Sequence, residues 1–444
     1  MDKKTAYNQP VTLGGILRFA VPTIVMSVFM SFYTMVDGLF VSNLIGTEAL
    51  SAINLTAPVI QLVTAISTML ATGGSAVIMK KMGEQKLREA REDFTFLILV
   101  NVVVGVVMWG TGYLVTGSMF GRMGLSEAVT GYCVEYLTGY LLFTVPILLM
   151  NNFTLYMIAS EKAGLSLVCS VAGGVLNLVL DYVLIRICSM GIRGAAVATG
   201  LGYSVTGVAG LVVFSRRDSL LHFVKPAVRQ GVLASAAGNG CSEMATALVT
   251  GIVTLMFNWT MLHYVGEQGV AAITIIMYVL MLASSLYTGY SYGVAPMISY
   301  YYGEGNREKL RKLVKISMKV TGVIALVSVA GSLAVTRPLV AVFARPDNPV
   351  YDLAVTGNRI CTAALLFIGF NIFASGMFTA LSNGVVSAVL AFSRSFVFMV
   401  AAMAVLPAVF GVTGIWLATP AAELMAFGMA GGVMVRYRRR YGYW

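Results

Sequence analysis

Long stretches without a single charged side chain dominate this chain. Residues 49–79, 94–121 and 360–393 are three of them, and each exceeds the ~20 apolar residues with which an α-helix crosses a bilayer. Only 11% of all residues are charged, less than half of the ~25% typical of soluble domains. Because water cannot solvate a folded surface with so few charges, the sequence predicts an all-α integral membrane protein.

Turns and charged loops divide the chain into twelve expected transmembrane helices. Their expected ranges are 14–44, 49–79, 94–117, 127–158, 163–187, 192–214, 230–261, 268–300, 316–336, 350–380, 386–408 and 412–435. Lys and Arg concentrate in alternate loops, for example between Lys80 and Arg91 and between Arg307 and Lys319. The positive-inside rule therefore predicts that both termini are cytoplasmic. Since the basic residues lie in loops, the net charge of +11 does not indicate a nucleic-acid partner.

An internal repeat appears when the sequence is compared with itself at an offset of 220 residues. Residues 46–84 align without a gap with residues 266–304, and the same offset pairs Asn151 with Asn371 and Thr199 with Thr419. Such a register indicates duplication. We expect two six-helix lobes, residues 1–215 and 230–444, joined by a cytoplasmic linker at 216–229. An even number of spans per half predicts a pseudo-twofold axis along the membrane normal, an architecture found among secondary transporters.

Acidic side chains inside expected spans indicate function, because a charge in the bilayer centre costs roughly 2.5–3.5 kcal/mol. Asp37 and Asp181 both lie about 12–14 Å below the outer ends of their helices, counted at 1.5 Å per residue. Asn177 shares a helix face with Asp181, and Thr199 enters the next helix to a similar depth. These oxygen ligands suit Na⁺ or a shared proton. The alternative is that the carboxylates only hydrogen-bond neighbouring helices, and that Thr199 bonds its own helix.

Glu243 and Glu423 lie near the middle of their expected spans and are candidates for a second carboxylate site or a substrate contact. The alternative is a pair of internally bonded structural carboxylates. Arg394, toward the inner end of its helix, is expected to snorkel to the interface. Pro22 interrupts the backbone hydrogen bonds of the first span and predicts a bend, which is either static or coupled to ion binding. No ATP-binding or catalytic motif occurs in the sequence, so we expect an ion gradient or the substrate's own gradient as the energy source and no cofactor.

Several segments closely resemble the MATE (multidrug and toxic compound extrusion) transporters, nearest the bacterial drug-efflux branch. They include VDGLFVSNLIGTEALSAINLTAPV (36–59), NLVLDYVLI (177–185) and GVTGIWLATPAAE (411–423). The resemblance implies two lobes around a cavity and exchange of Na⁺ or H⁺ for amphipathic, cationic compounds. It places Asp37, Asn177, Asp181 and Thr199 on the cation site of the N-terminal lobe and Pro22 on a bending first helix. Glu243 resembles a glutamate implicated in cation binding, but Asn371 stands where those members carry an aspartate, and Glu423 would have to compensate.

These features together predict a multidrug efflux antiporter of the bacterial inner (plasma) membrane that works by alternating access. Its expected partners are small organic substrates and membrane lipids, and we expect a monomer. A flippase for a lipid-linked saccharide would keep the same fold, but the scarcity of intramembrane Lys and Arg disfavours it. A membrane enzyme that processes lipids is disfavoured because no His, Cys or Ser constellation is present.

Overall fold

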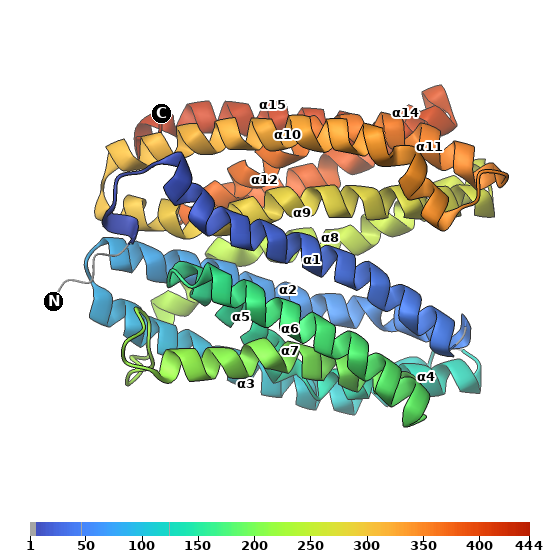
Figure 1. Ribbon diagram of the computed structural model, residues 1–444, viewed down its shortest axis with the longest axis horizontal. Coiled ribbons are helices and arrows are strands. Elements are labelled where there is room, and N and C mark those ends of the chain that lie inside the picture. The colour runs from blue at the N-terminus through green and yellow to red at the C-terminus, as the bar shows by residue number, and fades with distance from the viewer. Residues whose placement is uncertain (1–5, 46, 124) are drawn as a thin grey trace. The chain divides into compact units, whose positions relative to one another are not determined.

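The computed structural model describes residues 6–45, 47–123 and 125–444, apart from the side chains of Ala6, residues 37–51 and Gln230. All regular elements in these ranges are helices (Figure 1). The long unbroken ones are α1 (Leu13–Ile45), α2 (Thr47–Gly83), α3 (Leu87–Gly121), α7 (Gly191–Ser215), α8 (Gln230–Tyr264), α9 (Glu267–Glu304), α10 (Arg307–Phe343) and α15 (Val412–Tyr441).

The remaining spans are interrupted helices. A bend of 50° separates α4 (Glu127–Leu141) from α5 (Thr144–Ala159). In one further span, α6 (Ala163–Asp181) continues into the π-helix η2 (Tyr182–Ile187). Another consists of α11 (Pro349–Cys361), η3 (Thr362–Ala364) and α12 (Leu365–Ala380), and the last of α13 (Gly384–Phe392), the π-helix η4 (Ser393–Val397) and α14 (Phe398–Phe410). A short helix, η1 (Ala6–Asn8), precedes α1.

Within the described ranges, eleven helices are long and apolar enough to cross a membrane, and the bent α4–α5 pair brings the number to twelve. The predicted all-α membrane fold is therefore confirmed. Exposed large hydrophobic residues, such as Leu114 and Val342, occur on these helices because lipid rather than water surrounds a spanning segment.

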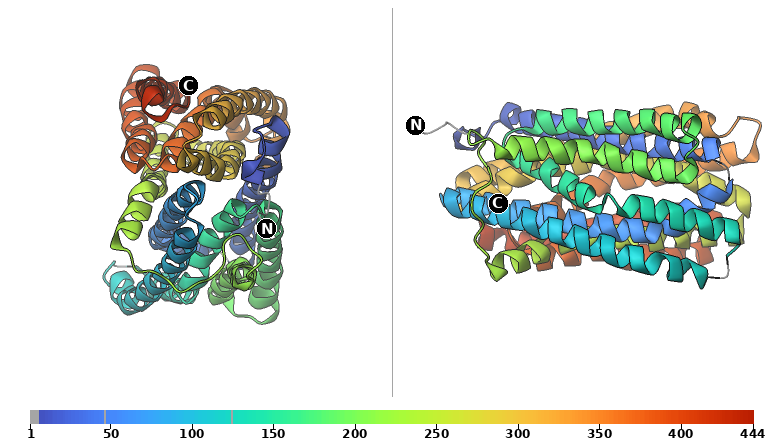
Figure 2. Two further views of the ribbon diagram at one scale, coloured as in Figure 1. Left: turned by 90° about the vertical axis from the view of Figure 1, so that its left-hand side faces the viewer. Right: turned by 90° about the horizontal axis from the view of Figure 1, so that it is seen from below.

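Contacts within the chain define two compact units. We call residues 29–240 the N-terminal unit and residues 1–28 with 241–444 the C-terminal unit. The helices of each unit pack along one another (Figure 2). The first part of α1 thus belongs to the C-terminal unit, and the first part of α8 to the N-terminal unit. The lobes 1–215 and 230–444 are defined by the sequence repeat rather than by contacts, and these boundaries stay a prediction.

Glycines related by the repeat explain this exchange of helix ends. A Cβ on Gly73 in α2 would lie 1.8 Å from the carbonyl oxygen of Ala236 in α8. A Cβ on Gly293 in α9, its counterpart at the 220-residue offset, would lie 2.8 Å from Cα of Ala20 in α1. Only glycine lets the backbones approach so closely. The first part of α8 therefore packs closely on α2 within the N-terminal unit, and the first part of α1 on α9 within the C-terminal unit.

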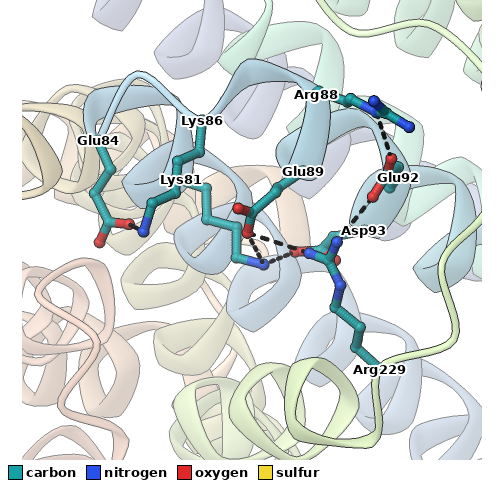
Figure 3. A network of polar contacts seen from close by, with 8 residues as sticks. All are labelled: Lys81, Glu84, Lys86, Arg88, Glu89, Glu92, Asp93 and Arg229. Atoms are coloured by element: carbon teal, nitrogen blue, oxygen red, sulfur yellow. Dashed lines mark hydrogen bonds and ion pairs between the residues drawn. The ribbon is translucent and has the colours of Figure 1, made fainter.

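A charged network at one end of the N-terminal unit anchors the linker (Figure 3). Asp93 in α3 is fully buried, bonds Lys81, and lies 3.6 Å from Nη1 of Arg229. Arg229 also pairs with Glu92 at 2.9 Å and with Glu89 at 3.2 Å. Because Arg229 directly precedes α8, these ion pairs fix the start of α8 to α3.

Candidate functional site

The N-terminal candidate site begins with close packing of α6 on α7, two helices that lie side by side (Figure 1). A Cβ on Gly173 would come within 2.5 Å of the Gly202 carbonyl oxygen, and a Cβ on Gly202 within 2.9 Å of Cβ of Asn177. A larger residue at either position would push the helices apart. The two glycines therefore bring the polar side chains one turn away within bonding distance of each other.

Those polar side chains are Asn177 and Thr199. Nδ2 of Asn177 donates a hydrogen bond of 3.3 Å to Oγ1 of Thr199, which donates to the Ala195 carbonyl oxygen at 3.0 Å. The back-bonding that we considered for Thr199 is therefore present, together with its contact to Asn177. Oδ1 of Asn177 is buried and has no hydrogen-bond partner among the described residues. A buried acceptor of this kind can take a cation or a proton donor as its partner.

Asp181 lies one turn beyond Asn177 on the same face of α6 and is fully buried. It is the last residue of the α-helical part, and the π-helix η2 starts immediately after it. π-Helical turns are rare and occur frequently at functional sites. Three of the four predicted cation ligands, Asn177, Asp181 and Thr199, therefore lie on two helices in direct contact.

The side chain of Asp37, the fourth predicted ligand, lies outside the described residues, but its position in α1 follows from the helix register. Tyr33, one turn before Asp37, lines a small cavity together with Gly173, Gly202 and Tyr203. In α6 and α7 this cavity lies about one turn from Asn177 and Thr199. The backbone of α1 thus reaches the level of the Asn177–Thr199 pair at Asp37.

Pro22 lies inside the continuous helix α1, six residues before the end of its C-terminal-unit part. Proline removes one backbone hydrogen bond in a helix interior. Whether the helix bends there during function stays a prediction.

Glu423 of the C-terminal unit has a different environment. It is 5% exposed, and Nε of Arg394 donates to its two carboxylate oxygens at 2.9 and 3.0 Å. Asn371 in α12 adds bonds from Nδ2 to Oε2 at 2.7 Å and to the main-chain oxygen at 2.9 Å. The expectation that Arg394 snorkels to the interface is wrong, because its guanidinium is held by a buried carboxylate. The internally bonded alternative for Glu423 is observed.

The helix geometry explains why counting residues did not find this ion pair. From the turn at Gly411, Arg394 is 17 positions back (411 − 394) and Glu423 is 12 positions on (423 − 411). At 1.5 Å per residue the two differ in depth by about 8 Å. Arg394 lies in the π-helical turn η4, and its long side chain reaches Glu423 across this difference in depth. The sequence did carry one indication of the pair: Arg394 and Glu423 are opposite charges in adjacent spans that are otherwise uncharged.

Glu243 in α8 is partly buried and lies within electrostatic range of Arg394 and of Tyr292 in α9. Glu243 and Glu423 are therefore not two equivalent carboxylates of one site. Glu423 is bonded directly to the arginine, whereas Glu243 only shares its field. Two carboxylates and one guanidinium leave one formal negative charge.

Comparison with known proteins identifies the family behind this arrangement. The model of the MatE family matches residues 22–183 and 244–406, most of both halves. The chain belongs to the MatE family. The resemblance to MATE transporters that the sequence indicated is thus confirmed. Membership of this family also makes the protein a transporter rather than an enzyme.

Relatives and solved structures of the MatE family match this chain over almost its whole length. The multidrug export protein MepA of Staphylococcus haemolyticus is 23% identical over 93% of this chain and 91% of its own. A solved MATE structure in complex with MaL6 has a TM-score of 0.90 at 23% identity and covers 96% of each chain. An outward-facing multidrug resistance MATE transporter has a TM-score of 0.89 at the same identity and coverage. At this identity, the solved structures establish the fold.

Proposed function

We propose that this MatE protein is a multidrug efflux antiporter that exchanges Na⁺ or H⁺ for small amphipathic, cationic organic compounds. The observation that carries the proposal is the fully buried Asp181 one turn from the Asn177–Thr199 pair. A carboxylate in a membrane span indicates an ion pathway by default. The name of the staphylococcal relative, a multidrug export protein, supports the efflux of varied compounds.

In this mechanism Asp37 and Asp181 bind the coupling cation from the outside, with Asn177 and Thr199 as neutral oxygen ligands. Cation occupancy favours the conformation that releases substrate, and substrate binding from the inside favours release of the cation. The two ligands need only differ in their affinity for the two conformations. Pro22 is the proposed bending point of α1, the helix that carries Asp37.

The C-terminal unit contributes substrate binding in this proposal. Arg394 already neutralises Glu423, so the remaining negative charge near Glu243 suits one positive charge of an organic substrate. The same pairing disfavours the flippase alternative, because it leaves the intramembrane guanidinium less available for a lipid-linked phosphate.

We further propose a monomer in the bacterial inner membrane with both termini in the cytoplasm.

The test is transport of a fluorescent organic cation in proteoliposomes with an imposed Na⁺ gradient, an imposed pH gradient or neither. We expect one of the gradients to drive accumulation and Asp37→Asn to abolish the gradient-dependent part. Asp347→Asn, a change on an exposed loop, is the matched control. Equal transport with and without gradients, or full coupling in Asp37→Asn, would contradict the proposal.

A further inference from the structure

A groove on the C-terminal unit lies between the first part of α1 and α10. It has a volume of about 500 Å³. Its lining is aliphatic with one exception: Leu13, Leu17, Ile24, Ile316, Val320, Val323 and Ile324 surround Lys319. The aliphatic side chains of this lining offer water no hydrogen bonds, and Lys319 is its one polar side chain.

The depth of Lys319 follows from the sequence of α10. From Val320 to Thr336, 17 residues (336 − 320 + 1) separate Lys319 from Arg337 without a charge. At 1.5 Å per residue this segment is about 26 Å long, close to the ~30 Å hydrocarbon core of a bilayer. Lys319 therefore lies at the level of the lipid headgroups, whereas Val323 and Ile324 face the hydrocarbon.

The charges around the groove select the headgroup. Lys319 is exposed and has no ion-pair partner among the described residues. Lys315, one turn earlier on the same helix, is also exposed and adds a second positive charge. A basic residue at the polar end of an apolar groove between spanning helices is the pattern that binds anionic phospholipids.

We propose that this groove binds an anionic phospholipid, with the phosphate on Lys319 and an acyl chain along Val320, Val323 and Ile24. Lysine suits this role because its aliphatic stem packs on the apolar wall while the ammonium reaches the interface. The bound lipid contacts the part of α1 that belongs to the C-terminal unit. The lining of the groove includes neither Glu423 nor Arg394.

Native mass spectrometry of the full-length protein tests the headgroup. Dioleoyl phosphatidylglycerol is titrated against dioleoyl phosphatidylcholine, which has the same chains and no net charge. We expect the wild type to prefer phosphatidylglycerol, and Lys319→Gln to weaken that preference about fivefold, the contribution of one lysine near a charged lipid. Lys319→Arg should retain it.

The control for charge is Lys312→Gln, which removes an exposed lysine from the same helix outside the groove. The control for shape is Val327→Trp, compared with Val323→Trp: both valines are exposed on α10, at 64% and 60%, but only Val323 lines the groove. Val323→Trp should reduce the binding of both lipids, and Val327→Trp should not. Equal loss in Lys312→Gln and Lys319→Gln, or equal binding of both lipids to the wild type, would overturn the proposal.

Discussion

Glu423 of the C-terminal unit and Asp181 of the N-terminal unit are both buried carboxylates, and they lie beside different polar neighbours. Glu423 is bonded by Arg394 and Asn371, so its negative charge is already matched within the protein. Asp181 lies beside the neutral Asn177–Thr199 pair, where an acceptor oxygen of Asn177 still lacks a partner among the described residues. The comparison teaches that two units built from similar helices differ in the polar groups around their buried carboxylates. Arg394 supplies the counter-charge of Glu423 within the C-terminal unit, whereas we propose that a coupling cation binds at Asp181 in the N-terminal unit.

The largest effect is expected from a variant that breaks the ion pair between Arg394 and Glu423. Arg394→Gln leaves Glu423 buried without its counter-charge, which costs about 3–5 kcal/mol of unfolding free energy. The measurement is thermal unfolding in detergent, where the midpoint should fall. Arg345→Gln, an exposed arginine of the same unit, should leave it unchanged. The double variant Arg394→Gln with Glu423→Gln should recover most of the loss; no recovery would mean that the pair is not the source of stability.

The next effect concerns transport rather than stability. Asp181→Asn should reduce the ratio of gradient-driven to undriven efflux by between about 5- and 150-fold, the usual size of a coupling between two ligands. It should change the unfolding midpoint little. The double variant Arg394→Gln with Glu423→Gln serves as the comparison and should keep its coupling. If the C-terminal double variant lost coupling and Asp181→Asn kept it, the roles of the two units would be reversed.

Asn371→Asp sharpens the comparison by adding a carboxylate beside Glu423. The donor to Glu423 is lost and a like charge appears, so stability in low salt should fall by about 1–3 kcal/mol. Added NaCl or lower pH should then raise the unfolding midpoint more than in the wild type. Asn151→Asp is the matched control, because this repeat counterpart donates to Oγ of Ser67 at 2.9 Å rather than to a carboxylate. The same salt response in both variants would argue against a local effect.

The smallest expected effect is that of Thr199→Val. It removes one neutral hydrogen bond from Asn177, worth about 0.5–1.5 kcal/mol, and one oxygen ligand of the proposed cation site. The apparent Na⁺ or H⁺ affinity for driving transport should fall severalfold. Thr419→Val changes the repeat counterpart, which is similarly buried, and should leave that affinity as it is. An equal loss in both variants would show that Thr199 has no special role.

The sequence by itself determined the membrane fold, the twelve spans and the family. Runs without charge and turns between them fix spanning helices, because lipid tolerates few other backbone conformations. The sequence also indicated that Asp181, Asn177 and Thr199 belong together, since helix periodicity and residue counting give their faces and depths.

Only the tertiary structure decided which charges meet. Residue counting did not predict the contact of Arg394 with Glu423, because it gives backbone depth only and a long side chain can reach a partner at another depth. It also did not show that the first parts of α1 and α8 pack in exchanged units, which depends on backbone approach at Gly293 and Gly73. Depth along one helix is a local property that sequence encodes, whereas partner choice between helices depends on how side chains and backbones fit together in space.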